Sequence, residues 1–193
     1  MPLPVAHGLI GASIFAASRP HESFKENWKP LLLGAILGIC PDLDLLLAWG
    51  FGLGNSWHGS FSHSITFALI VGPLVSAFMG NLSIKDASVC GSAVLSHAVL
   101  DAATSKVWGA IKLFWPLSDR NFNLGLFDYF EFIPNPETNP IGDDLKRGLE
   151  ISLYELLIFI PIFLLVLFIS RRIAQTRLSR REALSLAAQS AKD

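Results

Sequence analysis

The sequence predicts an all-α protein, a multi-span helical bundle in a membrane with candidate metal ligands at its helix ends. Of its 193 residues, 51% are hydrophobic and only 16% are charged, whereas soluble domains carry roughly 25% charged residues. The net charge of −1 provides no basic surface, so we expect no nucleic-acid partner. The length favours one domain. We assign residues 1–170 to a membrane-embedded domain and residues 171–193 to a basic cytoplasmic tail.

The clearest predicted span covers residues 151–170, because about 20 apolar residues are needed to cross roughly 30 Å of hydrocarbon. Pro161 inside it is tolerable if neighbouring helices satisfy the carbonyl that it leaves free. Two shorter apolar runs, residues 64–80 and 87–103, are joined by a short turn. They predict a helical hairpin.

The N-terminal third contains two further apolar runs. Residues 31–54 are apolar, but Pro41 interrupts them and should end the first of two helices. Residues 5–18 are too short to span a membrane alone. We expect this first helix to pack against the others.

Basic residues set the predicted orientation, because they favour the cytoplasmic side. The arginine-rich segment after residue 170 should stay inside, and counting back through the spans places residues 104–150 outside. We therefore predict a multi-pass protein of the inner (cytoplasmic) membrane with a cytoplasmic C-terminus. In the tail, Ser179-Arg-Arg-Glu182 has capping-box spacing and predicts that a helix begins there.

His97 and Asp101 form the first candidate ligand pair. On a helix these positions are i and i+4 and lie on one face, where two ligands can bind one metal ion. The alternative is a His–Asp hydrogen bond that fixes the helix.

His58 and His63 form a second pair, spaced by small residues just before an apolar run. They are candidate loop ligands. Ser62 or Ser64 is alternatively a simple cap for the helix that follows.

Asp42 and Asp44 follow Pro41 on a predicted turn, with their oxygens free to coordinate a metal ion. An unpaired aspartate near the bilayer centre costs about 2.5–3.5 kcal/mol, so two beside a leucine run favour a function. A cap for a helix beginning at Leu45 explains one aspartate but not both.

His7 has the least specific sequence context of the candidates. It becomes a candidate ligand because the other polar residues are found in similar positions. Four of the five histidines and three aspartates fall at the ends of apolar runs, on the predicted outer side. Intramembrane ionisable groups are functional candidates by default, and neutral imidazoles with carboxylates suit Zn²⁺ or a similar ion. The predicted ligands are His7, Asp42, Asp44, His58, His63, His97 and Asp101, with His58 a ligand or the partner of one.

Five short motifs follow one another over roughly residues 5–165: His7-Gly-Leu-Ile-Gly11, Gly38–Asp44, His58–Ser64, His97–Asp101 and Phe114-Trp-Pro-Leu-Ser118. In this order they resemble the YdjM-like family of membrane-bound, metal-dependent hydrolases. In the third motif, the family usually has Arg after the first histidine and Thr before the second, where this chain has Gly59 and Ser62.

The family is distantly similar to zinc-dependent phospholipase C and P1 nuclease, whose ligands include a His-x-x-x-Asp helix pair. The resemblance therefore implies phosphoester hydrolysis, and a site at a membrane surface suggests a lipid or lipid-linked phosphate substrate. We expect one or more divalent ions, with Zn²⁺ favoured, to activate water. Asp42 or Asp44 would serve as the catalytic base.

Two other functional classes fit the composition. Intramembrane Asp and His also build ion pathways, as in a transporter or metal-handling protein, although here they cluster at one depth. A non-catalytic scaffold would use them to join helices. Glu150 and Glu155 are weaker site candidates, and Glu155 is equally a candidate helix–helix contact. The sequence indicates no oligomeric state.

Overall fold

The computed structural model describes residues 3–19, 24–52, 58–80, 82–104, 111–126 and 141–190. These residues form helices and contain no strand beyond one isolated bridge between Ile111 and Phe122. The all-α prediction is therefore confirmed. In chain order the elements are α1 (Pro4–Ser18), α2 (Phe24–Ile39), the 3-10 helix η1 (Cys40–Leu43), α3 (Asp44–Phe51), the 3-10 helix η3 (Phe61–His63), α4 (Ile65–Phe78), α5 (Ile84–Thr104) and α6 (Ile141–Ser190).

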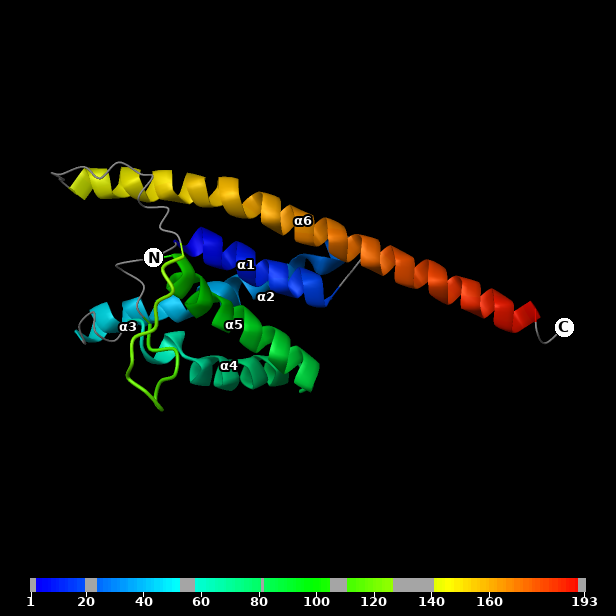
Figure 1. The fold of residues 1–193 in the computed structure, drawn as a ribbon, viewed down its shortest axis with the longest axis horizontal. Coiled ribbons are helices and arrows are strands. Elements are labelled where there is room, and N and C mark those ends of the chain that lie inside the picture. The colour runs from blue at the N-terminus through cyan, green and yellow to red at the C-terminus, as the bar shows by residue number, and fades with distance from the viewer. Residues whose placement is uncertain are drawn as a thin grey trace.

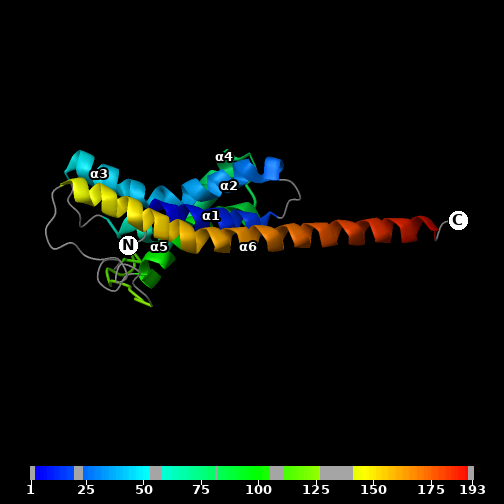
Figure 2. The same cartoon turned by 90° about the horizontal axis from the view of Figure 1, so that it is seen from above.

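Helix α1 lies at the centre of the bundle, packed against α2, α5 and α6 (Figure 1). The short first helix is thus covered by its neighbours, as expected. Helices α4 and α5 pack against each other, which confirms the predicted hairpin. Helix α6 runs along α1 and then continues past the other helices toward the C-terminus (Figure 2).

The predicted helix boundaries around the candidate site hold except at Asp44, which is the first residue of α3 and neither lies on the turn nor caps the helix, because Leu43 is the N-cap. Helix α2 ends at Ile39, and Pro41 occupies the first turn of η1. Of the two serines considered as caps, Ser64 is the N-cap of α4, and its hydroxyl accepts a hydrogen bond from the Phe67 N–H at 3.1 Å.

Helices α1 and α2 touch backbone to backbone through glycines. A Cβ atom added to Gly34 would lie 2.6 Å from the Gly11 carbonyl oxygen and 2.7 Å from the Phe15 ring. A Cβ on Gly38 would lie 2.3 Å from the His7 carbonyl oxygen. Gly34 and Gly38 are four residues apart, the small-xxx-small spacing that allows close helix contacts in membranes.

Helix α6 contains the predicted span and is continuous over 50 residues. It passes through Pro161 and beyond residue 170 without ending. The capping-box prediction is wrong, because the Ser179 hydroxyl donates to the Gln175 carbonyl within the helix at 3.1 Å. Residues such as Ala, Leu, Arg and Glu favour helix, so the tail extends α6 instead of starting a new helix.

Among the described residues, one helix is long and apolar enough to cross a membrane. It is the Gly148–Ser185 part of α6, which contains an 18-residue stretch with a mean hydropathy of 2.6, of which 22% is buried. Helices α1 and α4 are apolar but shorter.

Substitution of Gly34 by alanine should destabilise the protein by roughly 1–3 kcal/mol, the usual cost of overpacking. The reason is that the new methyl group would overlap the Gly11 carbonyl. Unfolding in detergent, followed by circular dichroism, measures the effect. Gly50→Ala is the matched control, because a Cβ there has no atom within 4 Å. Equal stability of the two variants would contradict the contact.

Candidate metal centre

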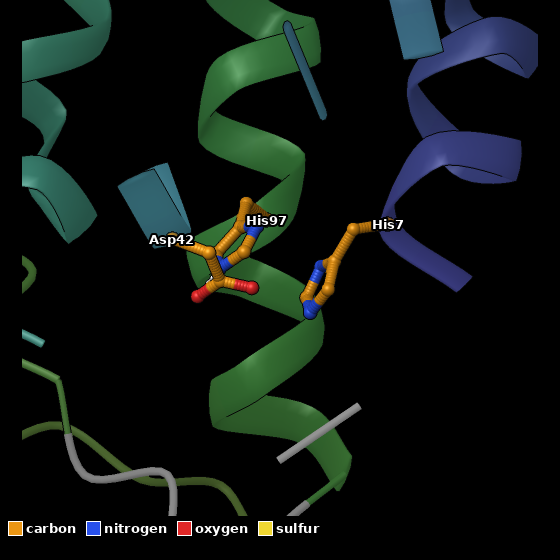
Figure 3. A group of neighbouring side chains, drawn as sticks. All are labelled: His7, Asp42 and His97. Carbon is orange, nitrogen blue, oxygen red and sulfur yellow. Dashed lines mark ion pairs between the residues drawn. The ribbon is translucent and has the colours of Figure 1, made fainter. Parts of the chain in front are cut away.

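The residues predicted as ligands come together at one end of the bundle. His7 lies in the first turns of α1, His63 ends η3, and His97 and Asp101 lie in the last turns of α5. The η1 turn brings Asp42 toward His7 and His97, and the three side chains point toward one another (Figure 3). Helices that run in opposite directions thus bring their ligand-bearing ends to the same place.

Asp101 is the centre of the cluster. Its side chain is fully buried, as are those of the three histidines that face it. Its Oδ1 lies 3.4 Å from His7 Nε2, and its Oδ2 lies 3.4 Å from both His63 Nε2 and His97 Nε2. Three imidazole nitrogens therefore surround one carboxylate. These N···O separations are longer than the usual N–H···O distance of 2.7–3.2 Å. They are therefore too long for ordinary His–Asp hydrogen bonds and are compatible with a cation bound between the nitrogen and oxygen atoms.

Asp42 lies at the more open side of the cluster. Its Oδ1 is 3.2 Å from His97 Nε2 and 3.8 Å from His63 Nε2. Its side chain is 19% exposed, whereas both histidine side chains are fully buried. The His7 and His97 rings stack with centroids 3.6 Å apart. Asp42 therefore connects the buried ligands with the surface.

Hydrogen bonds fix the orientation of two of the imidazoles. His97 Nδ1 donates to the Gly38 carbonyl oxygen at 2.8 Å, so in the neutral ring Nε2 is the nitrogen that would carry the lone pair for a cation. The Ser62 hydroxyl donates its single hydrogen to Asp44 Oδ2. It therefore accepts the N–H of His63 Nδ1, 2.9 Å away, and His63 Nε2 also presents a lone pair. Such outer partners are typical of metal-binding histidines.

Asp44 faces the outer partners of the site. Its Oδ1 lies 2.8 Å from His58 Nδ1, and its Oδ2 accepts from Ser62. Burial lowers the pKa of His58, but the hydrogen bond to Asp44 and the charge of that carboxylate more than offset it, so the pKa is raised above its ordinary value. Asp44 therefore orients His58 and, through Ser62, His63.

Six buried side-chain atoms in the cluster have no hydrogen-bond partner. Leaving a buried polar group unpaired costs about 1–3 kcal/mol, and neutral imidazole nitrogens with carboxylate oxygens are the ligands that zinc and similar ions prefer. The residues present thus fit a divalent cation. The unpaired atoms are His7 Nδ1 and Nε2, His63 Nε2, His97 Nε2, and Asp101 Oδ1 and Oδ2.

Three overlapping triads could hold an ion, each with ligand atoms within 4.8 Å of one another. They cover every predicted ligand except Asp44, which supports His58 and Ser62 instead. The triads are His7, Asp42 and His97; Asp42, His58 and His63; and His63, His97 and Asp101.

The segment between His58 and His63 is shaped by a glycine and by the later loop. Gly59 has a φ of +78°, a conformation that glycine adopts without strain. Its carbonyl accepts the Lys112 N–H at 2.8 Å. Thr66 at the start of α4 donates to the Trp115 carbonyl at 2.7 Å, so the Phe114–Ser118 motif supports the histidine segment from outside.

Two contributors were not found as site residues from sequence. The Gly38 carbonyl is a backbone atom and leaves no side-chain signal, although Gly38 belongs to one of the quoted motifs. Ser62 was considered only as a helix cap. Its position directly before His63 is the signal that could have identified it.

The fold and the site define an all-helical protein with a buried histidine and carboxylate cluster where apolar helices converge. A family model described as YdjM inner membrane protein matches residues 1–175. The chain belongs to this family, and all seven predicted site residues lie within the match. No curated protein and no solved structure matches the chain.

Asp101→Asn should abolish stoichiometric binding of a divalent ion, because the amide removes the charge that three imidazoles surround. Elemental analysis and Zn²⁺ titration of the purified protein in detergent measure this. Asp86→Asn is the matched control, since Asp86 is also a buried carboxylate of α5 but pairs with Arg19 near the other end of the helix. Equal metal content in the two variants would argue against the centre.

Proposed function

We propose that this protein is a membrane-bound, metal-dependent hydrolase that cleaves a phosphoester of a lipid or lipid-linked substrate. The observation that carries the proposal is the arrangement around Asp101, where three imidazole nitrogens face a buried carboxylate without hydrogen-bond partners. Such a set is costly unless a cation neutralises it. His7, His63, His97 and Asp101 would hold the ion, with Asp42 at the more open side of the cluster.

A divalent ion there would supply a Lewis acid and, in a zinc site, lower the pKa of water to about 7. The protein's own groups would divide the remaining work. Asp42 keeps 19% of its side chain exposed and contacts the ligand cluster, so it is placed to accept a proton from an attacking water. Asp44 uses its oxygens on His58 and Ser62 and would act as a positioning group.

The distribution of apolar surface supports a multi-span arrangement, and the arginine-rich segment after residue 170 supports an orientation with the site at the outer face. Leu69 and Phe78 on α4 are 69% and 91% exposed, and Leu157 and Leu165 on α6 are 72% and 58% exposed. Soluble proteins rarely expose such apolar surface contiguously, whereas lipid covers it at no cost. The start of α4 and the end of α5 both lie at the metal centre, so these helices would cross together.

Clustering at one end favours hydrolysis over transport. The seven polar residues gather where α1 and α4 begin and α5 ends, and they do not form a line along a helix. An ion pathway needs polar groups at successive depths. A passive scaffold would satisfy its buried groups with hydrogen bonds, whereas this cluster contains six unpaired atoms.

The purified protein should hydrolyse a lipid phosphomonoester or a phosphodiester in mixed micelles, and a chelator should abolish the activity reversibly. Asp42→Asn should lower kcat by about 10²–10⁴-fold, the usual contribution of a general base. His97→Ala should lower both the activity and the metal content. Release of inorganic phosphate or of the alcohol product measures the activity, and elemental analysis measures the metal content.

Asp119→Asn is the control for this assay, because Asp119 is a carboxylate that is 81% exposed and pairs with Lys112 in the outer loop. It should retain full activity. Hydrolysis that persists in both Asp42→Asn and His97→Ala would refute the enzyme. Metal binding without hydrolysis, together with ion flux in proteoliposomes, would favour the transporter.

Cysteine labelling tests the orientation. After Cys40 and Cys90 are replaced by alanine, Asp119→Cys in the outer loop should react with an impermeant maleimide in intact spheroplasts. Arg181→Cys, exposed near the end of α6, should react only after permeabilisation, because α6 would lie between the two positions. Labelling of both from the same side would show that α6 does not cross the membrane.

A further inference from the structure

Glu155 is a fully buried carboxylate near the start of Gly148–Ser185, the part of α6 that is long and apolar enough to cross a membrane. A carboxylate at such a position is costly in hydrocarbon and is functional by default. Glu155 is outside the ligand triads. Its two oxygens instead contact the backbone of α1, the helix that carries His7.

The contact has the form of a helix cap supplied by another helix. Glu155 Oε1 accepts the N–H of Leu3, and Oε2 accepts the N–H of Ala6 at 3.0 Å. Leu3 is the N-cap of α1 and has no side-chain cap of its own, and Pro4 follows it. In a capping box, two side chains within one helix satisfy these same N-cap and N3 donors. Here one carboxylate from α6 satisfies both.

The cap bears on His7 in particular, because His7 directly follows Ala6. The other buried histidines are oriented by ring hydrogen bonds, His97 by the Gly38 carbonyl and His63 by Ser62. Both ring nitrogens of His7 lack a hydrogen-bond partner. Its position is therefore set by the backbone of α1 and by stacking on His97.

We propose that Glu155 is a positioning residue of the metal centre, which holds the first turn of α1 so that His7 faces Asp101. The inference rests on the proposed metal site and adds α6 to the elements that build it. The negative charge of Glu155 also interacts favourably with the positive N-terminal end of the α1 helix dipole. A role limited to joining α1 with α6 is the alternative.

Ser170 provides a matched control for that alternative. Its hydroxyl donates to the Ala16 carbonyl, so it also joins α6 to α1. This contact lies about 15 Å further along α1 than Ala6, at 1.5 Å per residue. Ser170→Ala therefore removes a tie between the same two helices without touching the turn that carries His7.

The test is a Zn²⁺ titration against a competing chelator, using the full-length protein in detergent after metal removal. Glu155→Gln keeps the shape but turns amide hydrogens toward backbone donors. It should weaken binding by about 10–100-fold, as loss of an outer partner does. Ser170→Ala should leave the affinity unchanged. Glu155→Gln combined with His7→Ala should bind as weakly as His7→Ala alone, because Glu155 acts through His7.

Unfolding of the metal-free variants supplies the second measurement. Helix joining alone predicts that Glu155→Gln and Ser170→Ala both lose stability while both keep wild-type affinity, and that result would overturn the proposal. Fully additive losses in the double variant would also overturn it. If the wild-type protein binds no stoichiometric metal, the centre itself fails. The wild-type titration therefore separates failure of the metal site from failure of this assignment.

Discussion

The close contact between the backbones of α1 and α2 is the constraint on which the site depends. Gly38 has two roles in it. Because it has no side chain, the His7 carbonyl can approach closely; a Cβ atom on Gly38 would lie only 2.3 Å from that oxygen. The carbonyl of Gly38 itself accepts the hydrogen of His97 Nδ1. One glycine thus places the helix of His7 and orients the ring of His97. Helix packing and ligand geometry are therefore set by the same few atoms.

The unpaired polar atoms link this geometry to stability. Five of the six atoms face one another as His–Asp ion pairs at 3.4 Å and not as hydrogen bonds, and a buried polar group without a hydrogen bond costs about 1–3 kcal/mol. The packed helices hold them together even so, since Asp101 and the histidines are fully buried. Binding free energy of an ion would therefore add directly to folding free energy, and the apo protein would be the less stable form.

The sequence predicted most of the helices and which His and Asp side chains come together, for physical reasons. Apolar runs of helical length predicted α4, α5 and the 151–170 part of α6, and Pro41 predicted the turn that carries Asp42. The i, i+4 spacing of His97 and Asp101 placed them on one face. The interactions that sequence could not give are between distant segments. Gly38 contributes a backbone oxygen, which leaves no side-chain signal. Glu155 was named as a candidate helix–helix contact, which is confirmed, but the sequence did not indicate that its partner is the first turn of α1. The Ser179 prediction failed because a capping motif begins a helix only where the preceding residues are not already helical.

The side chains on one side of the site are buried and those on the other side are partly exposed, and this asymmetry is consistent with the proposed reaction at a membrane surface. The Asp101 side chain is fully buried against α1 and α5, while Asp42 and Asp44 on the other side are 19% and 15% exposed. The closed side meets packed helices and the open side meets the η1 turn and the His58 segment. In the proposed hydrolase, a substrate group would approach Asp42 from this more exposed side. A phosphate at a membrane surface would approach in this direction, and an ion crossing the bilayer would not.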